Sequence, residues 1–399
     1  MHPRVVALAA LGWALAACSE APPSAPNSAA STAPESAPAA ALVAVTGQAP
    51  QVRGRFIVTL APRANPSAVA REHGIRPDYV YTHALNGFAG RISDAARSGL
   101  LRDSRVTRVE ADGIATIVST ETGATWGLDR VDQRSRPLST TYSYTNTGAG
   151  VTAYIIDTGL RFSHGEFGGR ASSGYDAVDG GSADDCNGHG THVGGTIGGT
   201  TYGVAKGISL VAVRVLDCGG SGSWSGVIAG LDWVTANHAS PAVANMSLGG
   251  GTNTSVDDAV KRMIASGVAT AIAAGNGNAF GIARDACRTS PARVPQAMTI
   301  GATDQNDRKA SWSNYGNCVD WFAPGVGITS AWNTSDAATN TISGTSMATP
   351  HTAGVAALYL QSNPTASPQT VRDALFSNTT KGIVTSSKTS NNHLLFTNY

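Results

Sequence analysis

The chain has 399 residues, of which 42% are hydrophobic and 14% are charged, and its formal net charge is +1. This length favours two globular units with accessory segments, and the apolar fraction is sufficient for a sizeable core. The near-neutral charge excludes a protein built around a basic nucleic-acid-binding face or a strongly anionic tail. The 46 glycines predict tight turns and close backbone approaches, which are not features of a coiled coil or a long helical bundle.

The first 17 residues have the pattern of an export signal. Arg4 is followed by the apolar run 5–17, which is too short to span a bilayer. The run ends in Leu-Ala-Ala before Cys18, which resembles the bacterial lipoprotein signal, in which the cysteine is acylated after cleavage. Ordinary signal cleavage after Ala16 also fits the residues. Both alternatives predict an exported protein.

The next two segments differ sharply in composition. Residues 18–52 consist largely of Ala, Pro and Ser and lack the bulk to form a core, so we expect a disordered tether. Residues 53–119 instead predict a small α+β domain with the ferredoxin-like order βαββαβ. Its strands are expected at 55–60, 79–83, 87–92 and 105–112, and its helices at 66–73 and 95–102.

From residue 120 to residue 399 the pattern becomes strands alternating with helices. Residues 151–156 form an apolar run between Gly150 and Asp157, as expected of a strand buried on both faces. This alternation predicts an α/β fold, a doubly wound, mostly parallel sheet with helices on both faces. Functional residues of such sheets lie at the carboxyl ends of the strands. Further strands are predicted at 209–216, 242–247, 268–274, 298–303 and 319–322.

Three short segments carry chemically useful side chains. Asp157 directly follows the predicted strand 151–156, His189 lies between two glycines, and Ser346 stands at the start of a helix of small residues. Taken singly, Asp157 could be a turn residue and Ser346 a helix cap. A metal site at His189 and His192 lacks the Glu of the H-E-x-x-H motif and a third ligand. Together, Ser, His and Asp can act as nucleophile, base and orienting group.

The segments around these residues resemble the three signature segments of the subtilisin-like serine proteases. They are Asp-Thr-Gly at 157–159, His-Gly-Thr-His at 189–192 and Gly-Thr-Ser-Met-Ala-Thr-Pro-His at 344–351. The order Asp, His, Ser is that of subtilisin, and the flanking segments look closest to the proteinase K and aqualysin group. The resemblance covers residues 53–399 and implies a serine endopeptidase that hydrolyses peptide bonds through an acyl-enzyme.

The same resemblance assigns further residues to the site. Asn276 corresponds to the side-chain oxyanion donor, which acts beside the backbone N–H of Ser346; by itself it could be a turn residue before glycine. Gly222 and the segment Ser247-Leu248-Gly249 correspond to the two backbone edges that pair with a polypeptide substrate. The segment 276–290 is longer than expected for close relatives, so the shape of the neighbouring pocket is not predicted.

Residues 53–119 resemble the propeptide of this family, most clearly in Leu-Asn-Gly-Phe-Ala-Gly at 85–90. The resemblance implies a zymogen whose propeptide is a folding template and an intramolecular inhibitor, removed autocatalytically near residues 117–122. An unrelated βαββαβ binding domain is the alternative for this segment. The expected partners are polypeptide substrates and the propeptide, with no nucleic acid, and the protease is expected to be a monomer.

The location follows from the order of these segments. A lipid on Cys18 would anchor the precursor to a bacterial envelope membrane, and maturation would release the protease. The alternative function is a catalytically inactive surface lipoprotein that binds peptides in the same cleft. Such a protein would not need an intact set of Asp157, His189, Ser346 and Asn276.

Four further cysteines remain in the exported chain, at 186, 218, 287 and 318, and an even number permits three disulfide connectivities. The resemblance to aqualysin implies the pairs Cys186–Cys218 and Cys287–Cys318.

A structural Ca²⁺ site like that of proteinase K is also implied by the resemblance. Its ligands would be the carbonyls of Pro295 and Ala297 and the carboxylate of Asp320, because Ca²⁺ prefers oxygen ligands. Asp320 could otherwise be a salt-bridge or turn acid. Asp129, Asp132 and Gln133 resemble a second site, but Ser135 stands where another acid is expected. No cofactor is expected for catalysis.

Overall fold

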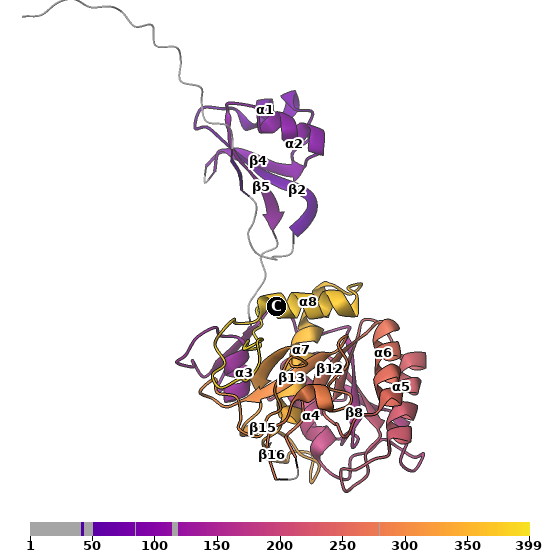
Figure 1. The fold of residues 1–399 in the computed structure, drawn as a ribbon. Coiled ribbons are helices and arrows are strands. Elements are labelled where there is room, and N and C mark those ends of the chain that lie inside the picture. The colour runs from indigo at the N-terminus through magenta and orange to yellow at the C-terminus, as the bar shows by residue number, and fades with distance from the viewer. Residues whose placement is uncertain (1–40, 44–50, 84, 114–118, 279) are drawn as a thin grey trace, which may run out of the picture. The chain divides into compact units, whose positions relative to one another are not determined.

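The computed structural model describes residues 41–43, 51–83, 85–113, 119–278 and 280–399. The chain divides into an N-terminal unit, residues 1–114, and a C-terminal unit, residues 115–399 (Figure 1). The export signal, Cys18 and most of the predicted tether lie outside the described residues. Within the described part of the chain, no helix combines the length and the apolar character needed to cross a membrane.

The N-terminal unit is a five-stranded sheet with two helices. Its strands lie in the order β1 (Ala41–Val43), β5 (Val106–Gly113), β2 (Gln51–Leu60), β4 (Gly87–Arg91) and β3 (Tyr79–Tyr81). The helices are α1 (Pro66–Glu72) and α2 (Asp94–Leu100), each capped by the side chain before it, Asn65 and Ser93. The predicted βαββαβ order is therefore present from β2 to β5.

The prediction of a disordered tether over residues 18–52 is wrong at its carboxyl end. Ala41–Val43 pairs in parallel with β5, and β2 already begins at Gln51. Backbone pairing explains the difference, because an edge strand such as β5 offers unpaired N–H and C=O groups to a further segment. The core of the unit is formed by apolar side chains of β2, β4, β5 and both helices, among them Val58, Phe88 and Leu100.

A seven-stranded parallel sheet organises the C-terminal unit and confirms the α/β prediction. Its order is β14 (Trp321–Pro324), β13 (Met298–Thr303), β12 (Val268–Ala273), β11 (Ala242–Met246), β8 (Thr152–Asp157), β10 (Ser209–Arg214) and β9 (Ala171–Asp176). Two short antiparallel pairs lie outside it: β6 (Ser119–Thr122) with β7 (Thr141–Tyr144), and β15 (Ile328–Ala331) with β16 (Thr339–Ile342). Ser119, at the predicted domain boundary, thus pairs within the C-terminal unit.

Helices cover both faces of this sheet (Figure 1). Residues of α4 (His189–Gly198) and α7 (Thr345–Ser362) share one hydrophobic core with Ile155, and residues of α5 (Trp224–Asn237) and α6 (Thr254–Ala265) share the other core with Ile156. Successive residues of β8 therefore enter opposite cores, which is why its sequence is an unbroken apolar run. The remaining helices are α3 (Trp126–Val131) and α8 (Pro368–Asn378), with 3₁₀ turns at Gly165–Phe167 and Ala286–Arg288.

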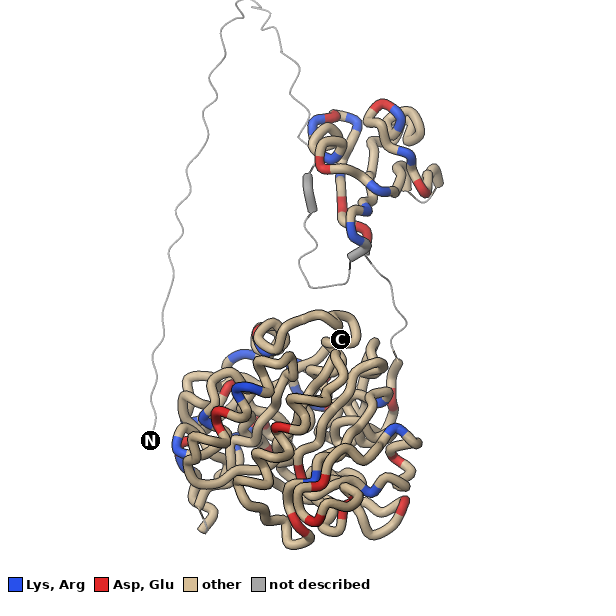
Figure 2. The backbone as a smooth tube through the Cα atoms, turned by 90° about the vertical axis from the view of Figure 1, so that its right-hand side faces the viewer, with Lys and Arg blue, Asp and Glu red and all other residues tan. Residues whose placement is uncertain are grey.

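Charged residues are sparse and scattered along the C-terminal unit, and they are denser along the N-terminal unit (Figure 2). The predicted strands differ from the observed ones mainly at their ends. β2 begins at Gln51 instead of residue 55. β14, predicted at 319–322, begins two residues later, because Val319 still belongs to a turn in which its N–H donates to the Gly316 carbonyl at 3.0 Å.

Candidate active site

Four neighbouring strands end at one edge of the large sheet, and each is followed by predicted site residues. β8 ends at Asp157, β11 is followed by Ser247, β12 by Asn276, and β10 by the segment that reaches Gly222. From β8 the chain builds the sheet toward β9 on one side and toward β14 on the other. Ligands of open α/β sheets bind at such a reversal of strand order.

Asp157 and His189 are joined by a short hydrogen bond. Asp157 is fully buried, and its Oδ1 lies 2.7 Å from Nδ1 of His189 and 2.8 Å from the donating N–H of Thr158. Its Oδ2 is buried with no hydrogen-bond partner among the described residues. This geometry orients the imidazole and places a negative charge where a positive one would form on the ring.

The same surroundings raise the pKa of His189 above its usual value. Burial alone would lower this pKa because it disfavours the charged ring. The charge and the hydrogen bond of Asp157, with a smaller contribution from the charge of Asp185, outweigh the burial. The neighbouring His192 has no such carboxylate, and burial lowers its pKa to about 4.

The two glycines beside His189 are required by the backbone. Gly188 precedes α4 with φ of 109°, which a side chain would strain. A Cβ on Gly190 would lie 2.2 Å from the carbonyl oxygen of Gly159. The helix can therefore approach the turn after β8 closely only because these positions lack side chains.

Ser346 is the second residue of α7, where the positive end of the helix dipole favours developing negative charge. Its Oγ donates to the carbonyl oxygen of Ser247 at 3.1 Å, and the Ser247 hydroxyl donates to the Ser346 carbonyl at 2.8 Å. No hydrogen bond joins Ser346 Oγ to His189 in the described part of the chain. His189 and Ser247 line the same groove.

Asn276 follows β12, and its amide is fixed by the residue before Ser346. Its Oδ1 accepts from the backbone N–H of Thr345 at 2.9 Å and from the Thr345 hydroxyl at 2.8 Å. Its Nδ2 has no hydrogen-bond partner among the described residues, and it lies 3.4 Å from the position that a Cβ on Gly344 would occupy. An oriented, unengaged N–H₂ group next to Ser346 is the arrangement that an oxyanion donor needs.

A groove of about 650 Å³ is lined by His189 and Ser247. Its lining also includes Gly222 and the rest of the segment 247–249, and in the described structure the backbone groups of Gly222, Leu248 and Gly249 have no internal hydrogen-bond partner. Gly222 has no room for a side chain, since a Cβ there would lie 2.1 Å from the Val215 carbonyl oxygen. The apolar side chains in the groove are those of Leu216, Trp224, Val227 and Leu248.

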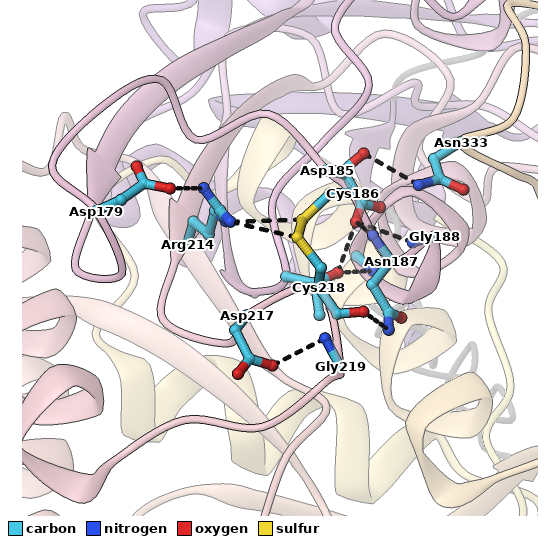
Figure 3. The surroundings of a disulfide bond; sticks show 12 residues. Asp179, Asp185, Cys186, Asn187, Gly188, Arg214, Asp217, Cys218, Gly219 and Asn333 are labelled. Carbon is cyan, nitrogen blue, oxygen red and sulfur yellow. Dashed lines mark hydrogen bonds and ion pairs between the residues drawn. A yellow bond between two sulfur atoms is a disulfide. The ribbon is translucent and has the colours of Figure 1, made fainter.

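Both expected disulfides are present, Cys186–Cys218 and Cys287–Cys318. The first links the loop before His189 to the segment before Gly222, and the Asn187 side chain donates to the Cys218 carbonyl at 2.9 Å beside it (Figure 3). The sequence did not distinguish this pairing from the other two without the family resemblance.

Asp320 is engaged by protein groups on both carboxylate oxygens. Oδ2 accepts from the Thr299 N–H at 2.7 Å, and Oδ1 accepts from the guanidinium of Arg372, on α8. The salt-bridge alternative for Asp320 is thus present. Each carboxylate oxygen retains a second lone pair, and in the described structure no hydrogen bond reaches the carbonyls of Pro295 or Ala297. Carbonyl and carboxylate oxygens are the ligand types that a hard cation prefers.

In the second group that resembles a calcium site, Asp129, Asp132 and Gln133, protein hydrogen bonds within the described structure reach only some of the carboxylate oxygens. The Asp129 carboxylate accepts from Gln133 and from the backbone N–H groups of Ser139 and Thr140. Asp132 Oδ2 accepts from the Ser143 N–H, but Oδ1 is buried without a partner among the described residues. Burial raises the pKa of Asp132 to about 6. No group of three or more His, Cys, Asp or Glu residues is assembled for a metal in the described ranges.

Several residues around the site were not predicted individually. Thr345 fixes Asn276, and Asn314 supports the same loop, donating to the Ala274 carbonyl at 2.8 Å and accepting from the Gly277 N–H at 3.1 Å. Asn314 lies in the segment Ser-Asn-Tyr-Gly at 313–316, one of the flanking segments that look closest to the proteinase K and aqualysin group, but the sequence assigned no role to it. In the long segment 276–290, Phe280 is 87% exposed.

Comparisons with known proteins agree with this architecture. Residues 148–395 match the Subtilase family, and residues 55–117 match Peptidase inhibitor I9. The chain is 59% identical over 326 residues to the extracellular serine proteinase of Thermus sp. (strain Rt41A), covering 81% of this chain and 78% of the relative. It is 53% identical over 331 residues to the alkaline serine exoprotease A of Vibrio alginolyticus, covering 81% of this chain and 61% of the relative.

A crystal structure of a cold-adapted subtilisin-like serine proteinase is similar to the chain with a TM-score of 0.66 and 55% sequence identity, and the match covers 69% of this chain and 98% of the other. Fold, sequence and the match over most of the C-terminal unit lead to one assignment. The chain belongs to the subtilase family of serine proteases and carries a peptidase inhibitor I9 domain before its catalytic unit.

Proposed function

We propose that this chain is the precursor of an exported serine endopeptidase that acts through an acyl-enzyme formed on Ser346. The arrangement that supports it best is the Asp157–His189 hydrogen bond together with an oriented Asn276 amide beside Ser346. Extracellular relatives support export of this chain as well. Nothing among the described residues or the relatives favours the alternative of an inactive peptide-binding lipoprotein.

In the proposed reaction His189 first accepts a proton from Ser346 and later donates it to the leaving group. Ser346 Oγ turns from the Ser247 carbonyl toward His189, gives its proton to Nε2 and attacks the scissile carbonyl carbon. The oxygen of that carbonyl becomes an oxyanion that accepts from Asn276 Nδ2 and the Ser346 N–H. His189 then protonates the leaving amine, which departs and leaves an ester on Ser346. Water gives a proton to His189 and attacks the ester carbonyl carbon; the bond to Ser346 Oγ then breaks, and His189 returns the proton to Oγ as the carboxylic acid leaves.

The substrate is proposed to bind as an extended strand between Gly222 and the segment 247–249. The unpaired backbone groups of these edges suit main-chain recognition, in which peptide N–H and C=O groups supply affinity and side-chain pockets supply preference. The I9 domain is proposed to inhibit the enzyme intramolecularly and to be removed by a cut near residues 117–122. The domain limits 53–119 and 120–399 remain predictions.

A labelling experiment tests the function directly. The purified protein should react covalently with an organofluorophosphonate probe, and the label should be absent when Ser346 is replaced by Ala. Digestion of a peptide mixture should produce new termini inside the peptides, which identifies an endopeptidase. A folded protein that takes up no label and cleaves no peptide would favour the inactive alternative.

On the acid side of the pH profile, the enzyme should lose activity at a pH above the usual pKa of histidine. The base form of His189 is neutral, and its pKa is raised, so activity is lost as the pH falls through that raised value. The profile of kcat/KM against pH should therefore bend at a pH above about 6.5. An acid limb below this value would contradict the effect of the two carboxylates on His189.

Calcium is proposed as a structural ion at Pro295, Ala297 and Asp320, and it is given no role in the reaction. When bound, it would stabilise the folded state by mass action. Because Arg372 already neutralises Asp320, chelation by EDTA should shorten the lifetime of the wild type at high temperature only moderately. In Arg372→Ala the ion becomes the sole cation at Asp320, so the difference between calcium and EDTA should widen.

The control is Gln369→Ala on the same helix, whose side chain bonds the exposed Asp373. Its calcium dependence should equal that of the wild type. Equal inactivation rates with calcium and with EDTA in the wild type and in Arg372→Ala would exclude the ion at Asp320.

Acylation of Cys18 is proposed for the precursor alone, since every proposed maturation cut lies after it. The precursor should then fractionate with membranes, and the mature protease should be soluble after processing. Mass spectrometry of the N-terminal fragment checks the lipid. Cys18 without lipid would leave ordinary secretion.

A further inference from the structure

The loop that leads into α4 contains two adjacent aspartates in opposite surroundings. The Asp184 side chain is exposed and has no hydrogen-bond partner among the described residues, whereas Asp185 is only 9% exposed. In the described part of the chain, no Lys, Arg or His forms an ion pair with Asp185. A buried carboxylate without a cation is costly unless hydrogen bonds satisfy it.

Asp185 is satisfied by donors from both sides of the site. Oδ1 accepts from the backbone N–H groups of Asn187 and Gly188 and from the hydroxyl of Thr158, each at 2.9 Å. Oδ2 accepts from the N–H of Thr191 at 2.9 Å and from its hydroxyl at 2.5 Å. These donors belong to the start of α4 and to the turn after β8. One carboxylate therefore bridges the two elements that carry His189 and Asp157.

Asp185 also replaces the missing cap of α4. The N-cap residue is Gly188, which has no side chain to accept from the first turn. The free N–H of Thr191 is taken by Asp185, and that of Gly190 by the Thr158 hydroxyl at 2.9 Å. The start of α4 is thus held by groups outside the helix, and the position of His189 depends on them.

The loop itself is fixed from the other side. The Asn333 side chain donates to the Asp185 carbonyl at 3.0 Å, and Cys186 is tied to Cys218 (Figure 3). These contacts hold Asp185 in place. Because its carboxylate is hydrogen-bonded to the first turn of α4, the position of the loop fixes the position of His189 at the start of that helix.

We propose that Asp185 is a positioning residue for catalysis: its carboxylate fixes the first turn of α4 against Thr158, so that the His189 ring meets Asp157, and its buried charge favours the imidazolium of the reaction. The inference rests on the proposed protease function and adds a second carboxylate to the known pair. The charged groups that act on the His189 ring are Asp157 on β8 and Asp185 on the loop, while His192 on the same helix is neutral above a pKa of about 4.

The test compares Asp185→Asn with Asp184→Asn, which removes the same charge from the exposed neighbour. Rates are normalised to the concentration of active sites titrated with an organofluorophosphonate. Asp185→Asn should lower kcat by about 10²-fold, as a small misplacement of a catalytic group does, with KM little changed. Its acid limb in kcat/KM should move to lower pH, because the base loses one of the two charges that raise its pKa. Asp184→Asn should match the wild type in both.

Thr191→Val serves as a second variant if Asp185→Asn fails to fold. It removes one donor to Asp185 and leaves the charge, so kcat should fall while the acid limb stays in place. A purely structural role would lower the melting temperature of Asp185→Asn without moving its acid limb, and that result would overturn the inference. Failure of the wild type itself to hydrolyse peptides would overturn the proposed protease function and, with it, the role of Asp185. An active wild type with an unchanged Asp185→Asn would overturn the role of Asp185 alone.

Discussion

Replacing Ser346 by Ala should lower turnover by on the order of 10⁶-fold and should leave the precursor uncut near residues 117–122. The hydroxyl at the start of α7 is the side chain that attacks the peptide bond in the proposed mechanism, and the same site is proposed to remove the I9 domain. Both losses should be measured in protein made in a protease-free host, by peptide hydrolysis and by gel mobility.

Ser343→Ala is the matched control, because this serine lies three residues earlier and its hydroxyl accepts only from the Gly327 N–H at 2.9 Å. It should be processed and active like the wild type. Appearance of mature-sized Ser346→Ala protein in the same host would show that another protease makes the cut.

Asn276→Ala should lower kcat by about 10²–10³-fold with little change in KM, since an oxyanion donor acts chiefly in the transition state. The Asn276 amide makes two different contacts, and the variants must distinguish between them. Oδ1 accepts from Thr345, and Nδ2 is proposed to donate to the oxyanion. Asn276→Asp keeps the acceptor and loses the donor. Steady-state kinetics and melting temperatures of both variants provide the measurement.

The expected outcome is that Asn276→Asp is at least as impaired as Asn276→Ala although its contact with Thr345 survives. Activity near that of the wild type in Asn276→Asp, combined with a large loss in Asn276→Ala, would show that Asn276 only supports Thr345.

The sequence predicted the sheet well because its strands are buried on both faces. Every residue of β13 is buried, and its observed limits, Met298–Thr303, are the predicted ones. The end of β14 was misplaced because the apolar Val319 belongs to a turn, and hydrophobicity does not distinguish a buried turn from a buried strand. The pairing of Ala41–Val43 with β5 was missed because it depends on the backbone of a strand more than 60 residues away.

Short motifs mark the three residues to which the proposed site is assigned, Asp157, His189 and Ser346. The residues that hold these groups were less visible. Asp185 contacts Thr158, which is 27 residues away in the sequence, and Thr345 contacts Asn276, which is 69 residues away. Such contacts are set by the packing of the strand ends, and no local pattern contains them.

The distribution of the site over the strand ends has a consequence for the cell that makes this protein. The proposed orienting acid, Asp157, ends the first strand of the seven-stranded sheet, whereas the proposed nucleophile, Ser346, belongs to a helix that follows the last strand of that sheet. A nascent or truncated chain that ends before residue 346 lacks the hydroxyl that is proposed to attack a peptide bond. The chain is therefore harmless to its neighbours throughout synthesis, and it becomes able to cut proteins only after the whole sheet is complete.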